Sequence, residues 1–213
     1  MTGVQTCALP ISPLNTCYNA LDRHVERGRG EQVALHYDSP VTGRKESFTY
    51  AALLGHVRRL AGALAGAGVG KGDRVLVYMP MVPEAVFAML ACARIGAIHS
   101  VVFGGFAPAE VSARVDDAKP KVVLTASCGI EPSRVVPYQP FLGEGIARSE
   151  HKPDLVVCLQ REVAPAELLD GWVDWAEFIA GPAGDAGADC VEVAATDPLY
   201  ILYTSGTTGK PKG

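Results

Sequence analysis

The hydrophobic and polar positions of this 213-residue chain follow one rhythm over its first third and another beyond it. In the first third, helical spacing predicts a helix over residues 15–27, capped by Asn15, and another over residues 50–67 with one apolar face. Between these helices, residues 32–37 and 45–49 alternate in the manner of strands, and the turn-forming sequence DSPVTG separates them. We therefore expect a hairpin between two helices.

Beyond the first third, short apolar runs alternate with helical segments. We expect strands over residues 73–79, 97–103, 121–126, 155–159 and 199–203. We expect helices over residues 83–95, 108–118 and 139–149, and a surface loop over residues 180–188. Buried strands that alternate with helices are typical of a parallel sheet covered on both faces. The predicted fold class is therefore α/β, with mostly parallel sheets flanked by helices.

Composition narrows the possible functions. A hydrophobic fraction of 48% is enough for a sizeable core, and a net charge of -4 with no basic stripe argues against a nucleic-acid partner. Arg94 and His99 interrupt the most apolar stretch, residues 85–106, so we expect no membrane span, and the N-terminus has no signal-peptide pattern. A cytoplasmic enzyme is the prediction, with His99 as a hydrogen-bonded core histidine.

The six cysteines lie far apart and form no C-x-x-C pair. A disulfide framework or a zinc site normally needs closer spacing. We therefore expect reduced thiols that serve as small hydrophobic side chains, and we expect no metal site.

Both ends of the chain lack a periodic pattern. Residues 1–12, MTGVQTCALPIS, can be back-translated into a string that resembles a sequencing adapter, so we expect an artefact there, or alternatively a disordered terminus. The chain stops at Gly213, inside a glycine-rich segment, so residues 13–213 are expected to be part of a truncated domain.

The segment TSGTTGKPKG, residues 204–213, has the composition of a phosphate-binding loop directly after a predicted strand. Glycines allow the backbone to approach a ligand closely, consecutive N–H groups can form an anion site, and hydroxyl and ammonium groups add donors and positive charge. The candidate ATP phosphate ligands are Thr204, Ser205, Gly206, Thr207, Thr208, Gly209, Lys210 and Lys212.

This loop does not follow the Walker A pattern of P-loop kinases and ATPases. Only two residues separate Gly206 from Gly209, and Pro211 follows Lys210 where the Walker pattern has Ser or Thr. A P-loop kinase or ATPase is therefore a disfavoured alternative, and a plain flexible loop is the other.

The segment YILYTSGTTGKPKG, residues 200–213, resembles the phosphate loop of the adenylate-forming superfamily, which includes acyl-CoA synthetases. The segments LNTCYNALDRH, YDSPVTG, GDRVLVYMP and GAIHSVVFGGF, beginning at residues 14, 37, 72 and 96, resemble its acetyl- and propionyl-CoA synthetase branch. The resemblance implies a partial N-terminal AMP-binding domain of the adenylate-forming fold without its C-terminal lid domain. It also implies ATP, Mg²⁺ and coenzyme A as co-substrates, and no catalytic residue within this chain.

The same branch suggests a coenzyme A site. By resemblance, Phe103, Gly104 and Gly105 lie against the CoA adenine, and Arg134 meets the 3′-phosphate. Glu131 stands where the branch has a first phosphate-binding arginine, so the two-arginine grip is incomplete here. The alternatives are a plain strand-end turn at the two glycines and a surface ion pair between the two charged residues.

The activity implied is ligation of a short-chain carboxylate to CoA, with ATP cleaved to AMP and pyrophosphate. ASCGIEPSRVV, residues 126–136, and the opening NTCYN, residues 15–19, look more like propionyl-CoA than acetyl-CoA synthetase, which favours propionate. Acetyl-CoA synthetase and a non-catalytic nucleotide-binding fragment are the alternatives, and the chain alone is expected to be inactive.

Overall fold

The computed structural model describes residues 14–203. The phosphate-loop candidates Thr204 to Lys212 therefore lie outside the described residues, as do residues 1–13. The first described segment contains a helical turn of π type, Tyr18–Asp22 (η1), and a second segment, Val25–Arg29 (η2), in which Arg27 and Gly28 depart from helical backbone angles. The Asn15 side chain accepts a hydrogen bond from the Tyr18 backbone N–H at 3.1 Å, which confirms the predicted cap.

A hairpin and a long helix follow. Strands β1 (Val33–Ser39) and β2 (Arg44–Thr49) pair antiparallel, as predicted, and lead into α1 (Tyr50–Gly66). The Thr49 hydroxyl accepts a hydrogen bond from the Ala52 N–H at 3.2 Å and caps α1. The apolar stripe predicted for this helix is buried in the core.

The centre of the molecule is a six-stranded sheet in the order β10-β4-β3-β5-β8-β9, and every neighbouring pair is parallel. Its strands are β3 (Arg74–Met79), β4 (Ile98–Phe103), β5 (Val122–Ala126), β8 (Leu155–Leu159), β9 (Trp172–Asp174) and β10 (Tyr200–Ile201). This arrangement confirms the predicted α/β class.

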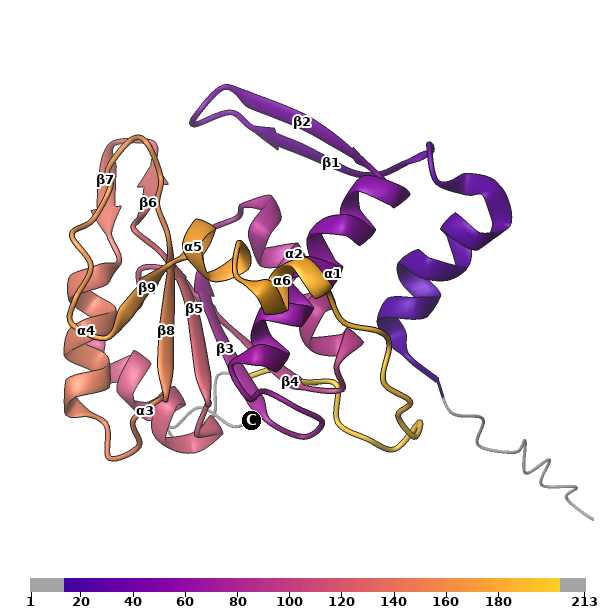
Figure 1. The fold of residues 1–213 in the computed structure, drawn as a ribbon. Helices are drawn as coiled ribbons and strands as arrows, with labels where there is room; N and C mark the ends of the chain where they lie inside the picture. The colour runs from indigo at the N-terminus through magenta and orange to yellow at the C-terminus, as the bar shows by residue number, and fades with distance from the viewer. Residues whose placement is uncertain (1–13, 204–213) are drawn as a thin grey trace, which may run out of the picture.

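Helices cover both faces of the sheet (Figure 1). One face carries α1, α2 (Pro83–Arg94) and α5 (Trp175–Ile179), and the other carries α3 (Pro108–Ala118) and α4 (Gln139–Arg148). Each face of the sheet has its own hydrophobic core. Along β3, Val75 and Val77 lie in the core beneath α1, α2 and α5, whereas Leu76 and Tyr78 lie in the core beneath α3 and α4. Successive side chains of a strand point to opposite faces, so one strand supplies both cores.

The prediction of a surface loop over residues 180–188 is wrong for the middle of that range. Residues Pro182–Ala186 form a short helix, α6, which packs against α1. Gly62 and Gly66 of α1 make this approach possible, because a Cβ added at Gly62 would lie 2.2 Å from the Ala183 carbonyl oxygen.

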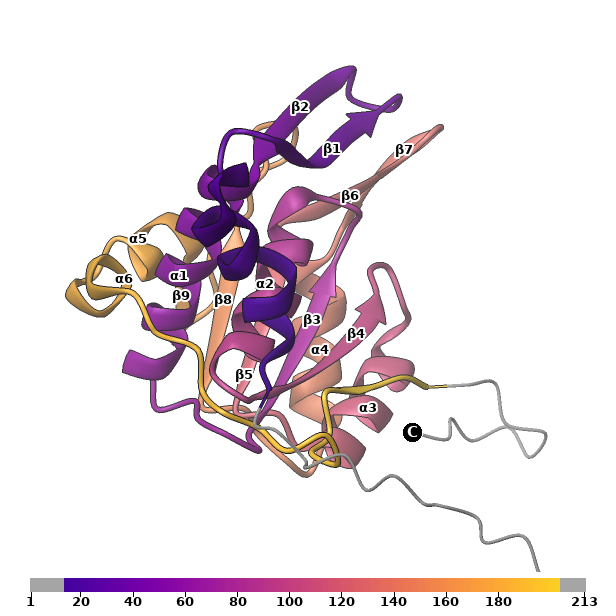
Figure 2. The same ribbon diagram turned by 90° about the vertical axis from the view of Figure 1, so that its right-hand side faces the viewer.

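Two hairpins project from the end of the sheet toward which the strands run (Figure 2). One is β1–β2, and the other is β6 (Cys128–Glu131) with β7 (Arg134–Pro137), which directly follows β5. Among residues 14–203, none of the helices has both the length and the apolar character that a bilayer crossing requires.

Candidate functional site

β10, which precedes the predicted phosphate loop in the sequence, pairs with β4, which leads into the candidate CoA glycines, at one edge of the sheet. β10 is parallel to β4, with Tyr200 opposite His99 and Ile201 opposite Ser100. The carboxyl ends of both strands therefore face the same side, where open α/β sheets usually bind ligands. The strand predicted over residues 199–203 is shorter in the structure, but it leads to the predicted loop.

Tyr203, the last described residue before the loop, is anchored to α3. Its hydroxyl donates to a carboxylate oxygen of Asp117 at 2.6 Å, and the Arg114 guanidinium lies 5.3 Å from the centre of its ring. Burial and the hydrogen bond to Asp117 raise the pKa of the Tyr203 phenol, so it remains a donor at neutral pH.

Arg114 also contacts the segment that follows β4. Its guanidinium lies 4.7 Å from the centre of the Phe106 ring, so it stacks on two aromatic residues from different parts of the chain. An ion pair with Glu110 at 2.8 Å, one turn earlier on α3, orients the arginine. Arg114 thus connects the entry to the predicted phosphate loop with the segment containing Gly104 and Gly105.

The turn after β4 has the backbone shape that its glycines allow. Gly105 has a φ of 97°, which L side chains rarely adopt. The Gly105 N–H donates to the Tyr78 hydroxyl at 3.0 Å, and that hydroxyl donates to the Phe106 carbonyl at 3.1 Å. Phe103, which precedes the turn, leaves 72% of its surface exposed.

Tyr138 is a site residue that sequence reasoning missed. A Cβ added at Gly104 would lie 2.3 Å from the Tyr138 ring, and one added at Gly129 of β6 would lie 2.2 Å from its hydroxyl oxygen. The ring therefore joins the turn after β4 to the β6–β7 hairpin, and burial raises the pKa of Tyr138 to about 12. The two glycines were a signal in the sequence, but only the structure shows that one ring covers both.

Glu131 and Arg134 form the last pair of the β6–β7 hairpin. The Arg134 Nε donates to a Glu131 carboxylate oxygen at 2.8 Å, and the side chains are 69% and 49% exposed. This hydrogen bond with Glu131 raises the pKa of Arg134. Because this ion pair uses only Nε, the terminal guanidinium nitrogens can still bind an anion. The surface ion pair is therefore compatible with the predicted contact of Arg134 with the CoA 3′-phosphate, which stays a prediction.

His99 packs beside the ring of Tyr200, with 5.8 Å between the ring centres. Burial lowers its pKa to about 4, so the imidazole is neutral at pH 7. Its Nδ1 is buried and has no hydrogen-bond partner within residues 14–203, so the expectation of a hydrogen-bonded histidine is wrong at that atom.

Together these groups offer an exposed aromatic ring, a glycine turn and a guanidinium at one end of the sheet. An aromatic face can stack on a planar base, a glycine turn lets a ligand approach the backbone, and a guanidinium can pair with a phosphate. The structure thus brings Phe103, Gly104 and Gly105 close to the base of the hairpin whose tip carries Glu131 and Arg134. Their assignment to coenzyme A remains a prediction.

Comparisons with known proteins agree on the class of enzyme. The family model described as "AMP-binding enzyme" matches residues 21–213. The chain is 54% identical over 202 residues to "Acyl-CoA synthetase short-chain family member 3, mitochondrial" of Rattus norvegicus, covering 94% of this chain and 29% of that protein. It is 46% identical over 202 residues to "Acetyl-coenzyme A synthetase" of Streptomyces avermitilis, covering 94% and 30%.

The crystal structure of the Brucella canis acyl-CoA synthetase has the same fold over 97% of this chain and 34% of that protein, with a TM-score of 0.76 and 26% identity. The chain therefore spans about a third of the length of the relatives it matches.

Proposed function

Because this chain belongs to the AMP-binding enzyme family and is homologous to short-chain acyl-CoA synthetases, we propose that it is part of an AMP-forming ligase that joins a short carboxylic acid to coenzyme A. The reaction class is acid–thiol ligation. The carboxylate attacks the α-phosphate of ATP, pyrophosphate leaves, and the acyl group then passes to the CoA thiol with release of AMP.

The observation that carries this proposal is that β10, which directly precedes TSGTTGKPKG in the sequence, pairs with β4, which leads into the glycine turn. In the proposed enzyme, backbone N–H groups and hydroxyls of Thr204 to Gly209 hold the β- and γ-phosphates, and Lys210 and Lys212 offset their charge together with Mg²⁺. Such a loop is most effective when its donors are fixed in advance, because the attack brings two anions together. The contacts of Tyr203 with Asp117 and Arg114 hold the entry to the loop.

For the acid we propose propionate, with acetate as the alternative. Identity to the acetyl-coenzyme A synthetase, at 46%, is lower than identity to the short-chain family member 3 protein, at 54%, so the chain is less similar to the relative whose name specifies acetate. The likeness of residues 126–136 to propionyl-CoA synthetase supports the same choice. We also propose a cytoplasmic location for the enzyme.

The test uses the protein encoded by the complete reading frame that contains this sequence, supplied with ATP, Mg²⁺, CoA and a series of acids from acetate to butyrate. We expect AMP, pyrophosphate and a thioester, with the highest kcat/KM for propionate. Lys210→Ala is expected to slow acid-dependent ATP–pyrophosphate exchange by about 10²–10³-fold, the usual cost of losing one preorganised electrostatic donor.

Lys45→Ala is the matched control, since this lysine pairs with Asp38 on the exposed β1–β2 hairpin, and it is expected to leave exchange unchanged. Formation of ADP with phosphate would instead indicate an ATPase, and ADP with a phosphorylated acceptor a kinase. A higher kcat/KM for acetate would contradict the choice of acid. We expect the 213-residue chain alone to show no exchange, because it spans about a third of its relatives.

A second test concerns the proposed coenzyme A site. Arg134→Ala is expected to raise the KM for CoA about tenfold, as for a loss of about 1.4 kcal/mol of binding, without changing pyrophosphate exchange. Arg148→Ala is the matched control, since Arg148 forms a similar exposed ion pair with Glu144 on α4. Equal KM values for the two variants would show that the Arg134 pair is only a surface contact.

A further inference from the structure

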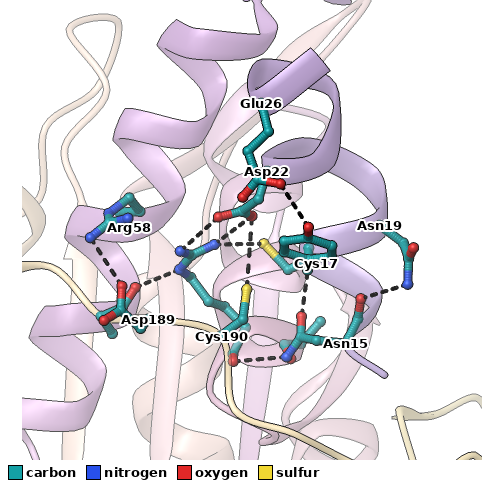
Figure 3. A network of polar contacts seen from close by, with 12 residues as sticks. Asn15, Cys17, Asn19, Asp22, Glu26, Arg58, Asp189 and Cys190 are labelled. Carbon is teal, nitrogen blue, oxygen red and sulfur yellow. Dashed lines mark hydrogen bonds and ion pairs between the residues drawn. The ribbon is translucent and has the colours of Figure 1, made fainter. Parts of the chain in front are cut away.

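Two cysteines that are far apart in the sequence lie together in a partly buried polar network (Figure 3). Cys17 belongs to the first helical segment, and Cys190 to the extended segment between α6 and β10. Their sulfur atoms and a carboxylate oxygen of Asp22 lie within 4.8 Å of one another, and both thiols are free. Spacing along the sequence gave no indication of this pair.

Backbone hydrogen bonds hold the two segments in place around the thiols. Leu14 and Val193 exchange two bonds of 3.0 Å, three residues before the first cysteine and three after the second. The Asn15 side chain donates to the Val191 carbonyl at 2.8 Å, and the Val191 N–H donates to the Arg94 carbonyl at 2.8 Å. These bonds fix the positions of the two backbone segments that carry the thiols.

The charges around the pair favour a thiolate on Cys17. The Arg94 guanidinium, 1% exposed, lies 3.6 Å from the Cys17 sulfur. The nearby Cys190 thiol and the contact with Arg94 lower the pKa of Cys17, whereas the nearby Cys17 sulfur and burial raise the pKa of Cys190. The Cys190 thiol directs its proton to a carboxylate oxygen of Asp22, 3.8 Å away. Because Arg94 donates to Cys17 and the Cys190 proton points to Asp22, we assign Cys17 as the nucleophile of the pair. Cys17 is 0% exposed and Cys190 is partly exposed, so a small oxidant reaches the pair from the side of Cys190.

A metal ion is a poorer occupant of this cluster. Two guanidinium nitrogens of Arg94 donate to the two carboxylate oxygens of Asp22 at 2.8 and 3.0 Å. A cation bound by Asp22 and the thiols would lie against this buried positive charge, which costs free energy in a medium of low dielectric.

We infer that Cys17 and Cys190 form an oxidant-sensitive dithiol site that closes to a disulfide on reaction with hydrogen peroxide. The Cys17 thiolate attacks a peroxide oxygen, the O–O bond breaks, and a sulfenic acid and a hydroxide form; the hydroxide takes a proton and leaves as water. The Cys190 sulfur then attacks the Cys17 sulfur, the S–O bond breaks, and the hydroxide leaves with the Cys190 proton as a second water. Each molecule of hydrogen peroxide is reduced by two electrons, which the two thiols supply.

The disulfide would tie the first helix to the segment that leads into β10. Cys92 and Cys158 are poor competitors, since burial raises the pKa of each to about 12. We therefore expect oxidation to occur at Cys17 and Cys190 in preference to the other cysteines. This expectation does not depend on the proposed ligase activity.

The test oxidises the purified chain with hydrogen peroxide in a Cys7→Ser background, so that every remaining cysteine lies in the described part of the structure. We expect the intact mass to fall by two hydrogen atoms, and peptide mapping to give one cross-link, between the Cys17 and Cys190 peptides. Dithiothreitol should reverse the change. The unfolding temperature of the oxidised form should rise by about 5–10 °C, as for a disulfide that closes a long loop.

Cys190→Ala should stop at a sulfenic acid on Cys17 that dimedone traps, and Cys92→Ala, which removes a buried thiol elsewhere, should behave like the parent chain. A cross-link that persists in Cys190→Ala would overturn the inference. So would pairing scattered among Cys92, Cys128 and Cys158, or a purified chain that retains stoichiometric zinc on these thiols.

Discussion

The ion pair between Asp22 and Arg94 provides a sharp test of the packing. Arg94 is 1% exposed and Asp22 is 12% exposed, and two hydrogen bonds join them. Asp22→Ala would leave the guanidinium in the core with only the Ala188 carbonyl and the Cys17 sulfur as partners. Removing one member of a buried pair typically costs about 3–5 kcal/mol, because the remaining charge is uncompensated.

That cost is a large share of the ~5–15 kcal/mol by which domains are usually stable. Urea unfolding followed by circular dichroism measures it. With a slope of about 1–3 kcal/mol/M, we expect the midpoint to fall by more than about 1 M, without a change in slope.

Asp38→Ala is the matched control, since it removes the same kind of side chain from an exposed ion pair with Lys45. The Asp38 side chain is 58% exposed and the Lys45 side chain is 73% exposed. We expect this variant to cost about 0–1 kcal/mol. Replacing both members of the buried pair, as in Asp22→Ala with Arg94→Met, should recover part of the loss because no charge is then left in the core. Equal midpoints for the Asp22 and Asp38 variants would refute the reasoning.

Three further predictions follow from local contacts. Gly104→Ala should destabilise the chain by about 1–3 kcal/mol, because the added Cβ would overlap the Tyr138 ring. Gly55→Ala, at an open position of α1, should instead stabilise it by about 0.5–1 kcal/mol. Urea midpoints that shift in the same direction for both variants would refute this. The pKa of His99 is lowered from 6.5 to about 4, so the unfolded chain binds more protons than the folded chain between these pH values. The free energy of unfolding should therefore decrease as the pH is lowered from 6.5 to about 4. His99→Leu should flatten that slope in urea midpoints measured from pH 7 to pH 4.5. Arg114→Lys should cost about 1 kcal/mol, since an ammonium cannot stack on two rings as a guanidinium does, and an unchanged midpoint would contradict the stacking.

The sequence alone determined the alternation of strands and helices and hence the α/β class. Periodicity is a local property, so the apolar runs and the capping residue Asn15 locate most elements to within a residue or two. The motif TSGTTGKPKG also required no structure to be recognised, and the family match over residues 21–213 agrees with the class of protein that it indicates. The roles assigned to its residues remain predictions.

The tertiary structure alone decided which distant residues meet. Helix α6 was missed because small residues carry little periodic signal, and it is held against Gly62 of α1 by a close backbone approach. The contact of Tyr138 with two glycines and the pairing of Cys17 with Cys190 join segments far apart along the chain. Such contacts depend on how the sheet orders its strands, which is set by the packing of the whole core and not by the residues next to each contact.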